Sequence, residues 1–593
     1  MIRAIAPSYG ALCALVLCLA ACGGSDDSAN NSGSTPTAPQ AASDAAVQGM
    51  TVGSKDTFTA DPTVPRPSTT PCEVVLFKGQ EFKDFSSKRF DYAPPAACAG
   101  PWAKVVLEAD FSSTMGRQYD RSAHISINGV NLYTGTTQEP SADVAPTWHV
   151  QRDVTEYSQV LRNAAVGYVD LDNLFDNTYT GLLTGSARLK FYPASATEPA
   201  LPAAQVVWGF SAGANGRPIQ ISSGNPLAKR TLELPRNMVR VYLDVIPQGQ
   251  SGEEFWFSCV TDRLKTILDS CGGTALRELV VQIDGQTVGV APVYPWIFTG
   301  GMNPALWRSI PSVQAFNLLP YRLDLSPFAG LLNDGKSHEF SFSVPGSTSY
   351  FAVLGVLLGY TDAASTVVSG GVISNTAADA AKVGVDDQIK GNNSSEATGS
   401  LSMGAQRSYS TSGYIVSSKG REELSTSYSM SFSNLQTYTE STQNYTQNTR
   451  VSTTSTAQLG GVTHTVQRNY SYPLVVDLKV DADGKYEWKT DIGFTEALLR
   501  QDSKGGSFAS SVQSEVSTYS YVPLKPEGKL RRAAHNYFYT DTAGGCFKRK
   551  VTSEQLALTS AVDAAQCGGA GSLARMPYST SPQGGWVGGA LGW

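Results

Sequence analysis

Short segments of alternating apolar and polar residues occupy the chain between about residues 71 and 360. Arg121–Ile127 is representative, because Ala123 and the two isoleucines share one face under a period of two. The segment ends at Asn128-Gly129, the dipeptide preferred in two-residue hairpin turns, where both residues need a positive φ. Similar runs follow at short intervals without helical stretches between them. This pattern predicts an all-β protein built from sandwich or jelly-roll domains.

A Pro/Ala-rich link at Pro193–Pro202 divides these runs into two groups. We therefore predict a first jelly-roll domain over residues 69–200 and an adjacent second one over residues 201–362. Residues 363–400 are rich in Ala, Ser, Gly and Asp and are predicted to be a linker. From residue 401 to 540, Ser and Thr alternate with Tyr, Val, Leu and Phe, which is typical of long, half-exposed antiparallel strands. Residues 401–593 are accordingly predicted to form a third, β-rich C-terminal domain.

The N-terminus has the pattern of an export signal. Arg3 precedes the apolar run Ala11–Ala20, which is too short to span a bilayer, and the tetrapeptide Leu-Ala-Ala-Cys that ends at Cys22. This tetrapeptide resembles a bacterial lipobox, which implies lipid attachment to Cys22 and, with Gly23 next, an outer-membrane location. A plain secretory signal is the alternative. Residues 1–22 are predicted to be a lipoprotein signal peptide, and the Ser/Ala/Thr/Pro-rich residues 23–68 a flexible tether.

Six cysteines remain beyond the signal. An even number of cysteines in an exported chain indicates disulfides, although the sequence alone permits many pairings. The six fall into three well-separated local pairs. The simplest prediction is therefore Cys72–Cys98, Cys259–Cys271 and Cys546–Cys567.

Charge and composition exclude several classes of partner. Charged residues make up 16% of the chain, the net charge is -6 and no long basic run is present, so we expect no nucleic-acid partner. The cysteines lack metal-ligand spacing and the five histidines are scattered, so we expect no metal and no cofactor. We expect a monomer.

One acid, directly before the segment Arg121–Ile127, is a candidate functional residue. Asp120 lies between Arg117 and Arg121, and the alternation places it on the polar face of the strand. Two nearby guanidinium groups would hold its carboxylate in the charged form. On spacing alone, a surface ion pair is the commoner outcome for such a residue. His124 on the same face is expected to be a structural histidine.

Several sequence blocks stand in a specific order between about Pro71 and Tyr360. They are Gly116–Arg121, Gln138–Pro140, Trp148–Val150, Leu171–Leu174, Tyr179–Gly181, Glu254–Trp256, Phe298–Arg308 and Asp334–Phe340. In these blocks the chain closely resembles the peptide-N-glycosidase A family of plants and microbes. It has a fainter resemblance to flavobacterial peptide N-glycosidase F, which is built from two jelly rolls side by side.

The resemblance implies an enzyme, a peptide-N4-(N-acetyl-β-glucosaminyl)asparagine amidase. Such an enzyme hydrolyses the amide between Asn and the innermost GlcNAc of an N-glycan, releases the glycan and converts Asn to Asp. The implied partner is an N-glycosylated peptide or glycoprotein. Two other functions remain open: a non-catalytic glycan-binding lipoprotein, and a glycoside hydrolase that uses the same carboxylates.

The resemblance also implies site residues. Asp120 matches the catalytic aspartate in a Glu-Trp-Asp-Arg stretch of peptide N-glycosidase F, and its two supporting acids carry over to Asp172 and Glu254. Two departures matter: Tyr119 stands where that enzyme has Trp, and Asp172 stands where it has the longer Glu. The alternatives to Asp172 are its neighbours Asp170 and Asp176.

Amide hydrolysis needs a base that activates water, a donor for the developing oxyanion and an acid for the departing nitrogen. We assign Asp120 as the base and Arg121 as the residue that orients the substrate. Glu254, whose apolar neighbours would raise its pKa, is the proton donor or orients the water, and Asp172 binds the sugar or the amide. The other substrate-binding candidates are Arg117, Tyr119, Trp148, Trp256, Trp296 and Trp307. For the four tryptophans, the alternative is packing in the core.

Overall fold

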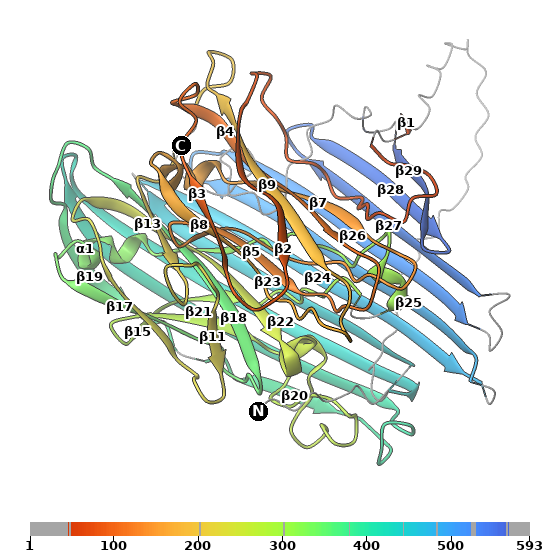
Figure 1. The fold of residues 1–593 in the computed structure, drawn as a ribbon. Coiled ribbons are helices and arrows are strands. Elements are labelled where there is room, and N and C mark those ends of the chain that lie inside the picture. The colour runs from red at the N-terminus through yellow and green to blue at the C-terminus, as the bar shows by residue number, and fades with distance from the viewer. Residues whose placement is uncertain are drawn as a thin grey trace, which may run out of the picture.

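The computed structural model describes residues 45–46, 49–200, 203–300, 303–378, 380–442, 444–459, 461–481, 484–522, 529–564 and 567. Within them the chain is almost entirely β-structure, which confirms the all-β prediction (Figure 1). None of the described helices is long and apolar enough to cross a membrane. They are η1 (Thr155–Leu161), η2 (Ser251–Glu253), η3 (Trp256–Ser258), η4 (Pro304–Trp307), η5 (Ser326–Phe328) and α1 (Ala329–Leu332).

The first β-sandwich consists of two four-stranded antiparallel sheets. One has the order β2 (Cys72–Phe82), β9 (Leu183–Pro193), β4 (Trp102–Ser113), β7 (Thr147–Asp153). The other has the order β3 (Lys88–Tyr92), β8 (Ala165–Leu171), β5 (Ser122–Ile127), β6 (Val130–Thr136). Alternate residues of each strand, such as Phe82, Ile125 and Leu189, are buried between the sheets. The predicted hairpin at Asn128-Gly129 is confirmed, with φ angles of 51° and 74°.

The second β-sandwich is built in the same way. Its first sheet has the order β10 (Val206–Phe210), β18 (Tyr350–Thr361), β13 (Met238–Gln250), β16 (Tyr321–Asp324), and β11 (Ile219–Ser222) also pairs with β18. Its second sheet has the order β12 (Ala228–Glu233), β17 (Ser337–Ser343), β14 (Glu278–Ile283), β15 (Gln286–Pro292). Leu243, Phe340 and Phe351 are fully buried in its core.

A buried ion cluster joins the two sandwiches. Arg322 of β16 donates to Glu156 of η1 at 2.9 Å and to Asp244 of β13 at 2.6 Å. Tyr157 also donates to Asp244 at 2.6 Å, and Tyr360 donates to Glu156. Because each carboxylate is matched by the guanidinium and by a phenol, the cluster stabilises one relative placement of the two sandwiches.

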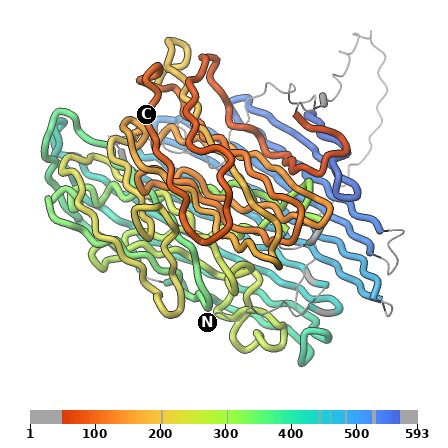
Figure 2. The backbone as a smooth tube through the Cα atoms, in the orientation of Figure 1, coloured from red at the N-terminus to blue at the C-terminus, as the bar shows by residue number. Residues whose placement is uncertain are grey.

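The third part of the molecule is a 12-stranded sheet of long antiparallel strands. Figure 2 shows its cyan-to-blue strands crossing behind the two sandwiches. Its strands alternate buried and exposed residues, as predicted for half-exposed strands, and one face packs on the second sandwich. Its central strands are β21 (Gly399–Ser417), β22 (Gly420–Ser441), β23 (Asn444–Leu459), β24 (Val462–Val480), β25 (Tyr486–Asp502), β26 (Ser507–Val522), β27 (Leu530–Asp541), β28 (Cys546–Glu554) and β29 (Ala557–Asp563).

The segment predicted to be a linker, residues 363–400, is partly β-structure. It contains β19 (Ser369–Asn375) and β20 (Val383–Asp387), and both pair with β21. Their small and polar residues suit edge strands, which have one neighbour and bury little side-chain surface. The composition of these segments therefore did not indicate that they are strands.

The predicted tether is also wrong for its described C-terminal part. Residues 49–66, called the N-terminal arm below, pack between the first sandwich and the 12-stranded sheet. Ala60 is 0% exposed and its backbone amide donates to His535 Nδ1 of β27 at 2.9 Å. The Val64 amide donates to Gln151 of β7 at 3.1 Å, and Arg66 pairs with Glu108 at 2.9 Å. The arm is held by backbone-to-side-chain hydrogen bonds, which a composition rich in Ser, Thr and Pro does not reveal.

Residues before the arm are described only at β1 (Ala45–Ala46), which pairs with β29. The predicted signal peptide, Cys22 and the rest of the tether lie outside the described residues. The three predicted disulfides, Cys72–Cys98, Cys259–Cys271 and Cys546–Cys567, are confirmed.

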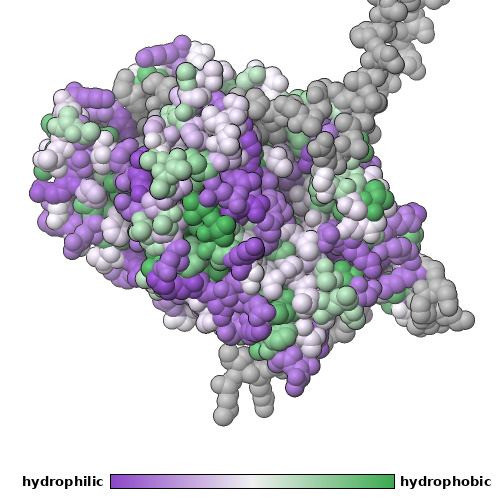
Figure 3. Space-filling model, turned by 45° about the horizontal axis from the view of Figure 1, so that its top comes forward, coloured by the Kyte–Doolittle hydropathy of each residue, from purple (hydrophilic) through white to green (hydrophobic). Residues whose placement is uncertain are grey.

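Figure 3 shows one face of the molecule, on which hydrophobic residues gather in small patches among hydrophilic ones. No broad apolar area is visible on that face. The large apolar side chains of the described residues are mostly inside two large cores, one in the first sandwich and one shared by the second sandwich and the 12-stranded sheet.

Candidate active site

Asp120 lies at the junction of the two sandwiches. It ends the loop between β4 and β5, two residues before β5 begins. Thr299, in the loop that follows β15 of the second sandwich, places its hydroxyl 3.3 Å from Asp120 Oδ2 and donates to the Thr137 carbonyl at 2.6 Å. The Arg121 amide in turn donates to Thr137 Oγ1 at 2.8 Å. These bonds fix the backbone on both sides of the carboxylate.

Glu254 faces Asp120 from the second sandwich, in the turn between η2 and η3. Burial and then the negative charge of Asp120 raise the pKa of Glu254 to about 8. Glu253, its neighbour, has a different environment, because Arg277 donates to its fully buried carboxylate at 2.7 Å. Glu253 is therefore a structural ion-pair residue, while Glu254 is a protonated acid beside Asp120 at neutral pH.

A further acid, Glu139, belongs to the same group and was missed by sequence analysis. Burial and then Asp120 raise the pKa of Glu139 to about 8. Its Oε2 is buried and has no hydrogen-bond partner within the described residues. Arg308 donates to its backbone carbonyl at 2.5 Å. The one available signal was the block Gln138–Pro140, which contributed to the resemblance without suggesting a role for its acid.

Asp172 lies after β8 and is held by Arg217, which donates to its carboxylate. Asp172 and Glu254 lie near the same tyrosine, because burial and the charges of these two acids together raise the pKa of Tyr350. The structure thus brings Asp120, Glu254 and Asp172 together. Because a guanidinium already matches its charge, Asp172 suits binding and positioning better than proton transfer.

The two alternatives to Asp172 make other contacts. Asp170 is 3% exposed and accepts a hydrogen bond from Ser87. Asp176 accepts backbone amides of Thr178 at 2.7 Å and Tyr179 at 2.8 Å, and so stabilises a turn.

Arg121 lies beside Asp120, and its side chain is largely buried. Its Nη2 donates to Gln118 Oε1 at 3.1 Å, while its Nε is buried without a hydrogen-bond partner within the described residues. A buried, unmatched donor beside the candidate base can meet a substrate oxygen.

Arg117, which was expected to hold Asp120 in its charged form, contacts two tyrosine side chains. Its guanidinium donates to the Tyr119 hydroxyl at 3.1 Å and lies 5.1 Å from the Tyr179 ring centre. The Tyr119 and Tyr179 ring centres are 5.5 Å apart. These three side chains form a partly exposed aromatic and cationic rim.

Two predicted sugar-contacting tryptophans are core residues. Trp148 is 3% exposed and stacks between Phe111 and Phe316. Trp256 is 2% exposed and packs edge-on against Phe257. Large rings lose most water contact in the core of a sandwich, and this outweighed their suitability for sugar faces.

Trp296, Trp307 and His124 are the remaining candidates. Trp296 is partly buried against Tyr294, and the Trp307 side chain lies outside the described residues although its backbone is in η4. His124 is buried beside Thr134, and burial lowers its pKa to about 3, so it is structural as predicted. Among the described residues, no group of His, Cys, Asp and Glu could hold a metal ion.

Comparison with known proteins identifies the family of the chain. The family model described as peptide N-acetyl-beta-D-glucosaminyl asparaginase amidase A matches residues 62–376, and a model of the family's C-terminal domain matches residues 400–474. Peptide-N4-(N-acetyl-beta-glucosaminyl)asparagine amidase A of Prunus dulcis is 28% identical over 375 residues, which cover 60% of this chain and 64% of that protein. The match thus spans less than two thirds of the relative's length.

Two solved structures are also similar to part of the chain. PNGF-II has a TM-score of 0.34 and 14% identity, with 49% of this chain and 65% of that one covered. PNGase F of Flavobacterium meningosepticum has a TM-score of 0.33 and 12% identity, with 49% and 96% covered. Since the family model covers more than half of the sequence, the chain belongs to the peptide N-acetyl-β-D-glucosaminyl asparaginase amidase A family.

Proposed function

We propose that this protein is a peptide N-glycosidase, which hydrolyses the amide between Asn and the innermost GlcNAc of an N-glycan. The observation that carries the proposal is the pairing of Asp120 with Glu254, whose pKa is raised to about 8. One carboxylate that can accept a proton and one acid that can donate a proton are what amide hydrolysis requires. Family membership supplies the substrate class.

In the proposed reaction, Asp120 accepts a proton from a water molecule as that water attacks the amide carbon. The Arg121 guanidinium stabilises the negative charge that develops on the amide oxygen. Glu254 then donates its proton to the departing nitrogen, and the C–N bond breaks. The products are a 1-amino sugar, which later loses ammonia, and a peptide with Asp in place of Asn.

The surrounding residues suit a glycopeptide. The rim of Tyr119 and Tyr179 offers aromatic faces that can cover apolar patches of a sugar ring or peptide. Asp172, held by Arg217, can accept hydrogen bonds from sugar hydroxyls. Glu139, protonated at neutral pH, can donate a hydrogen bond to a substrate oxygen.

A mass measurement tests the proposal. We expect incubation with a denatured high-mannose glycopeptide to remove the whole glycan and to leave the mass change of an Asn-to-Asp conversion. A GlcNAc that remains on the peptide would instead identify a glycoside hydrolase. An unchanged peptide that nevertheless binds the protein would leave only a glycan-binding role.

We also propose that the protein is an exported bacterial lipoprotein of the outer membrane, anchored through Cys22, and that it acts as a monomer. The support is the Leu-Ala-Ala-Cys tetrapeptide that follows the apolar run. Radiolabelled palmitate should be incorporated into the wild-type chain in its host and not into the Cys22→Ser variant. Equal labelling of the two chains would contradict the anchor.

A further inference from the structure

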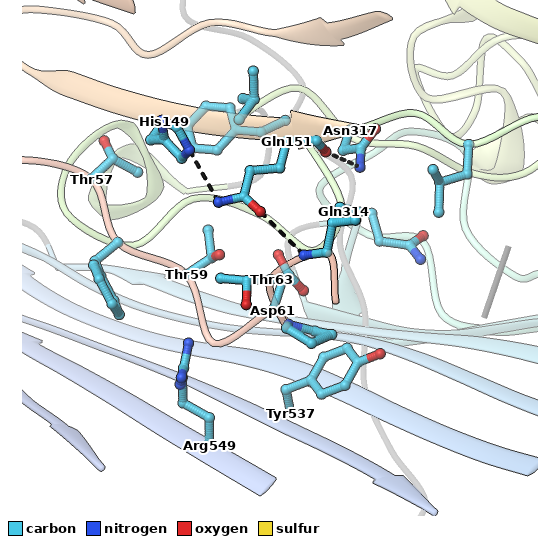
Figure 4. A pocket seen from close by; sticks show the side chains of 16 residues that line it. Thr57, Thr59, Asp61, Thr63, His149, Gln151, Gln314, Asn317, Tyr537 and Arg549 are labelled. Atoms are coloured by element: carbon cyan, nitrogen blue, oxygen red, sulfur yellow. Dashed lines mark hydrogen bonds between the residues drawn. The ribbon is translucent and has the colours of Figure 1, made fainter. Parts of the chain in front are cut away.

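A second cavity lies away from Asp120, where the N-terminal arm passes between the first sandwich and the 12-stranded sheet. It has a volume of about 190 Å³. Figure 4 shows His149 and Gln151 of β7 on one side, Tyr537 and Arg549 of the 12-stranded sheet on the other, and arm residues between them. The cavity is therefore closed only when all three parts of the chain are in place.

The arm presents a polar edge to this cavity because its residues alternate. Ala60 and Val64 are 0% and 3% exposed, and their backbone amides donate to His535 and Gln151. The intervening residues Thr59, Asp61 and Thr63 line the cavity with their side chains more exposed. Two hydroxyls and a carboxylate therefore line one space.

The charges around the cavity argue against an anionic ligand. The Arg549 guanidinium is matched by Asp563 through hydrogen bonds of 2.7 and 3.0 Å. The His149 ring is likewise bonded to Asp110 at 2.6 Å. Asp61 adds a negative charge at the centre. A phosphate or carboxylate would therefore meet no available cation and one repelling charge.

The remaining groups are those that bind a neutral, polyhydroxylated ring. The hydroxyls of Thr59 and Thr63 offer donors and acceptors, and Phe58 and Phe316 contribute apolar surface. The Gln151 amide is already bonded to Val64, Arg66 and His149, and the Asn317 amide to Arg152. The hydroxyl of Tyr537 is buried and has no hydrogen-bond partner within the described residues. A few polar groups beside aromatic surface in a concave site are the usual composition of a small-ligand pocket.

We propose that this cavity binds a single pyranose unit, separately from hydrolysis at Asp120. Its ligand is either a free neutral monosaccharide or one unit of a larger glycan. The identification of the larger glycan as an N-glycan rests on the proposed function. The binding of a pyranose does not. The cavity also adjoins the segment between β15 and β16: the Phe58 amide donates to the Ser309 carbonyl at 2.8 Å, next to Arg308, which contacts Glu139.

Saturation-transfer NMR on the purified chain tests the proposal. The probes are methyl α-mannoside, N-acetylglucosamine, galactose and a released high-mannose oligosaccharide, with glutamate and a lysine tripeptide as charged comparisons. We expect binding of at least one pyranose and of neither charged compound. Binding of a monosaccharide at millimolar concentration identifies the free sugar as ligand, and binding of the oligosaccharide alone identifies a glycan unit.

Variants locate the binding. Thr59→Val and Thr63→Val each remove one hydroxyl with little change of shape, and each should weaken pyranose binding about five-fold. Thr59→Trp should fill the cavity and abolish binding. The matched control, Thr454→Val on β23, should bind like the wild type. The Asp120→Asn variant should retain sugar binding although it fails to hydrolyse, which separates this proposal from the proposed function.

Two results would overturn the inference: no transfer to any pyranose in the wild-type chain, or undiminished transfer in a folded Thr59→Trp variant. Binding of the lysine tripeptide alone would also contradict it, because the cavity would then recognise a cationic side chain through Asp61. Thermal unfolding of each variant shows that its fold is retained.

Discussion

Two groups of acids lie between the same two sandwiches and have opposite environments. In the Glu156–Arg322–Asp244 cluster, each carboxylate accepts charged hydrogen bonds from one guanidinium and a bond from a tyrosine. In the Asp120 group, no described residue donates a hydrogen bond to the carboxyls of Glu254 and Glu139, and burial raises both pKa values to about 8. Burial also raises the pKa of Glu156, to about 7, so the two groups differ chiefly in their hydrogen-bond partners. The matched cluster stabilises the fold, whereas the unmatched acids are a cost to stability that chemistry at the site can explain.

The largest expected effect is on the base. Asp120→Asn should lower deglycosylation about 10³-fold, because the amide cannot accept a proton from water. The melting temperature should stay near that of the wild type. Mass spectrometry of a glycopeptide and thermal unfolding measure the two quantities. Near-normal turnover in this variant would show that the base is another residue.

The neighbouring glutamates give a sharper test of matched against unmatched acids. Glu254→Gln should reduce turnover about 10²-fold with little loss of stability, because only the proton donor is removed. Glu253→Gln should instead lower the free energy of unfolding by about 3 kcal/mol, since Arg277 would keep an uncompensated buried charge. Chemical denaturation and single-turnover rates separate the two. The same outcome for both variants would remove the distinction.

A substitution in the ion cluster should lower the stability of the protein and leave its turnover unchanged. Arg322→Met leaves Glu156 and Asp244 buried without their guanidinium and should cost about 3–5 kcal/mol of unfolding free energy. Urea denaturation checks the loss, and turnover of the fraction that remains folded should be unchanged. A large fall in turnover per folded molecule would connect the cluster to catalysis.

The unmatched acids should make stability depend on pH. A Glu254 carboxyl with a folded pKa of about 8 keeps its proton where the unfolded chain, with the ordinary glutamate pKa of 4.5, has lost it. The folded state therefore binds more protons between these values, and its stability falls as the pH rises from about 5 to 8. Glu254→Gln should remove part of this fall, about 1–2 kcal/mol, in urea denaturation at the two pH values. Identical pH profiles of the variant and the wild type would contradict the raised pKa.

The smallest effect is expected at the rim. Tyr179→Ala should raise KM several-fold and leave kcat almost unchanged, because stacking on the rim binds substrate and transition state alike. Steady-state kinetics with a fluorescent glycopeptide measure both constants. A lowered kcat with an unchanged KM would instead place Tyr179 at the reacting bond.

Local pattern was sufficient for some features. The strand at Ser122–Ile127, its Asn128-Gly129 turn and the three cysteine pairs were predicted because each depends on residues close together in the sequence. The site acids Asp120, Glu254 and Asp172 came from the resemblance and not from spacing. The errors concern Trp148, Trp256 and the arm, whose environments are made by distant segments.

By itself, the sequence determined the all-β class and the hairpin turns, since alternation and positive-φ residues act over short distances. Tertiary structure alone decided which acids share a site and in which state. Glu253 and Glu254 are adjacent and identical in type, but one meets Arg277 and the other meets Asp120. Burial and the charge of a facing segment set a pKa, and neither is a property of a residue's neighbours along the chain.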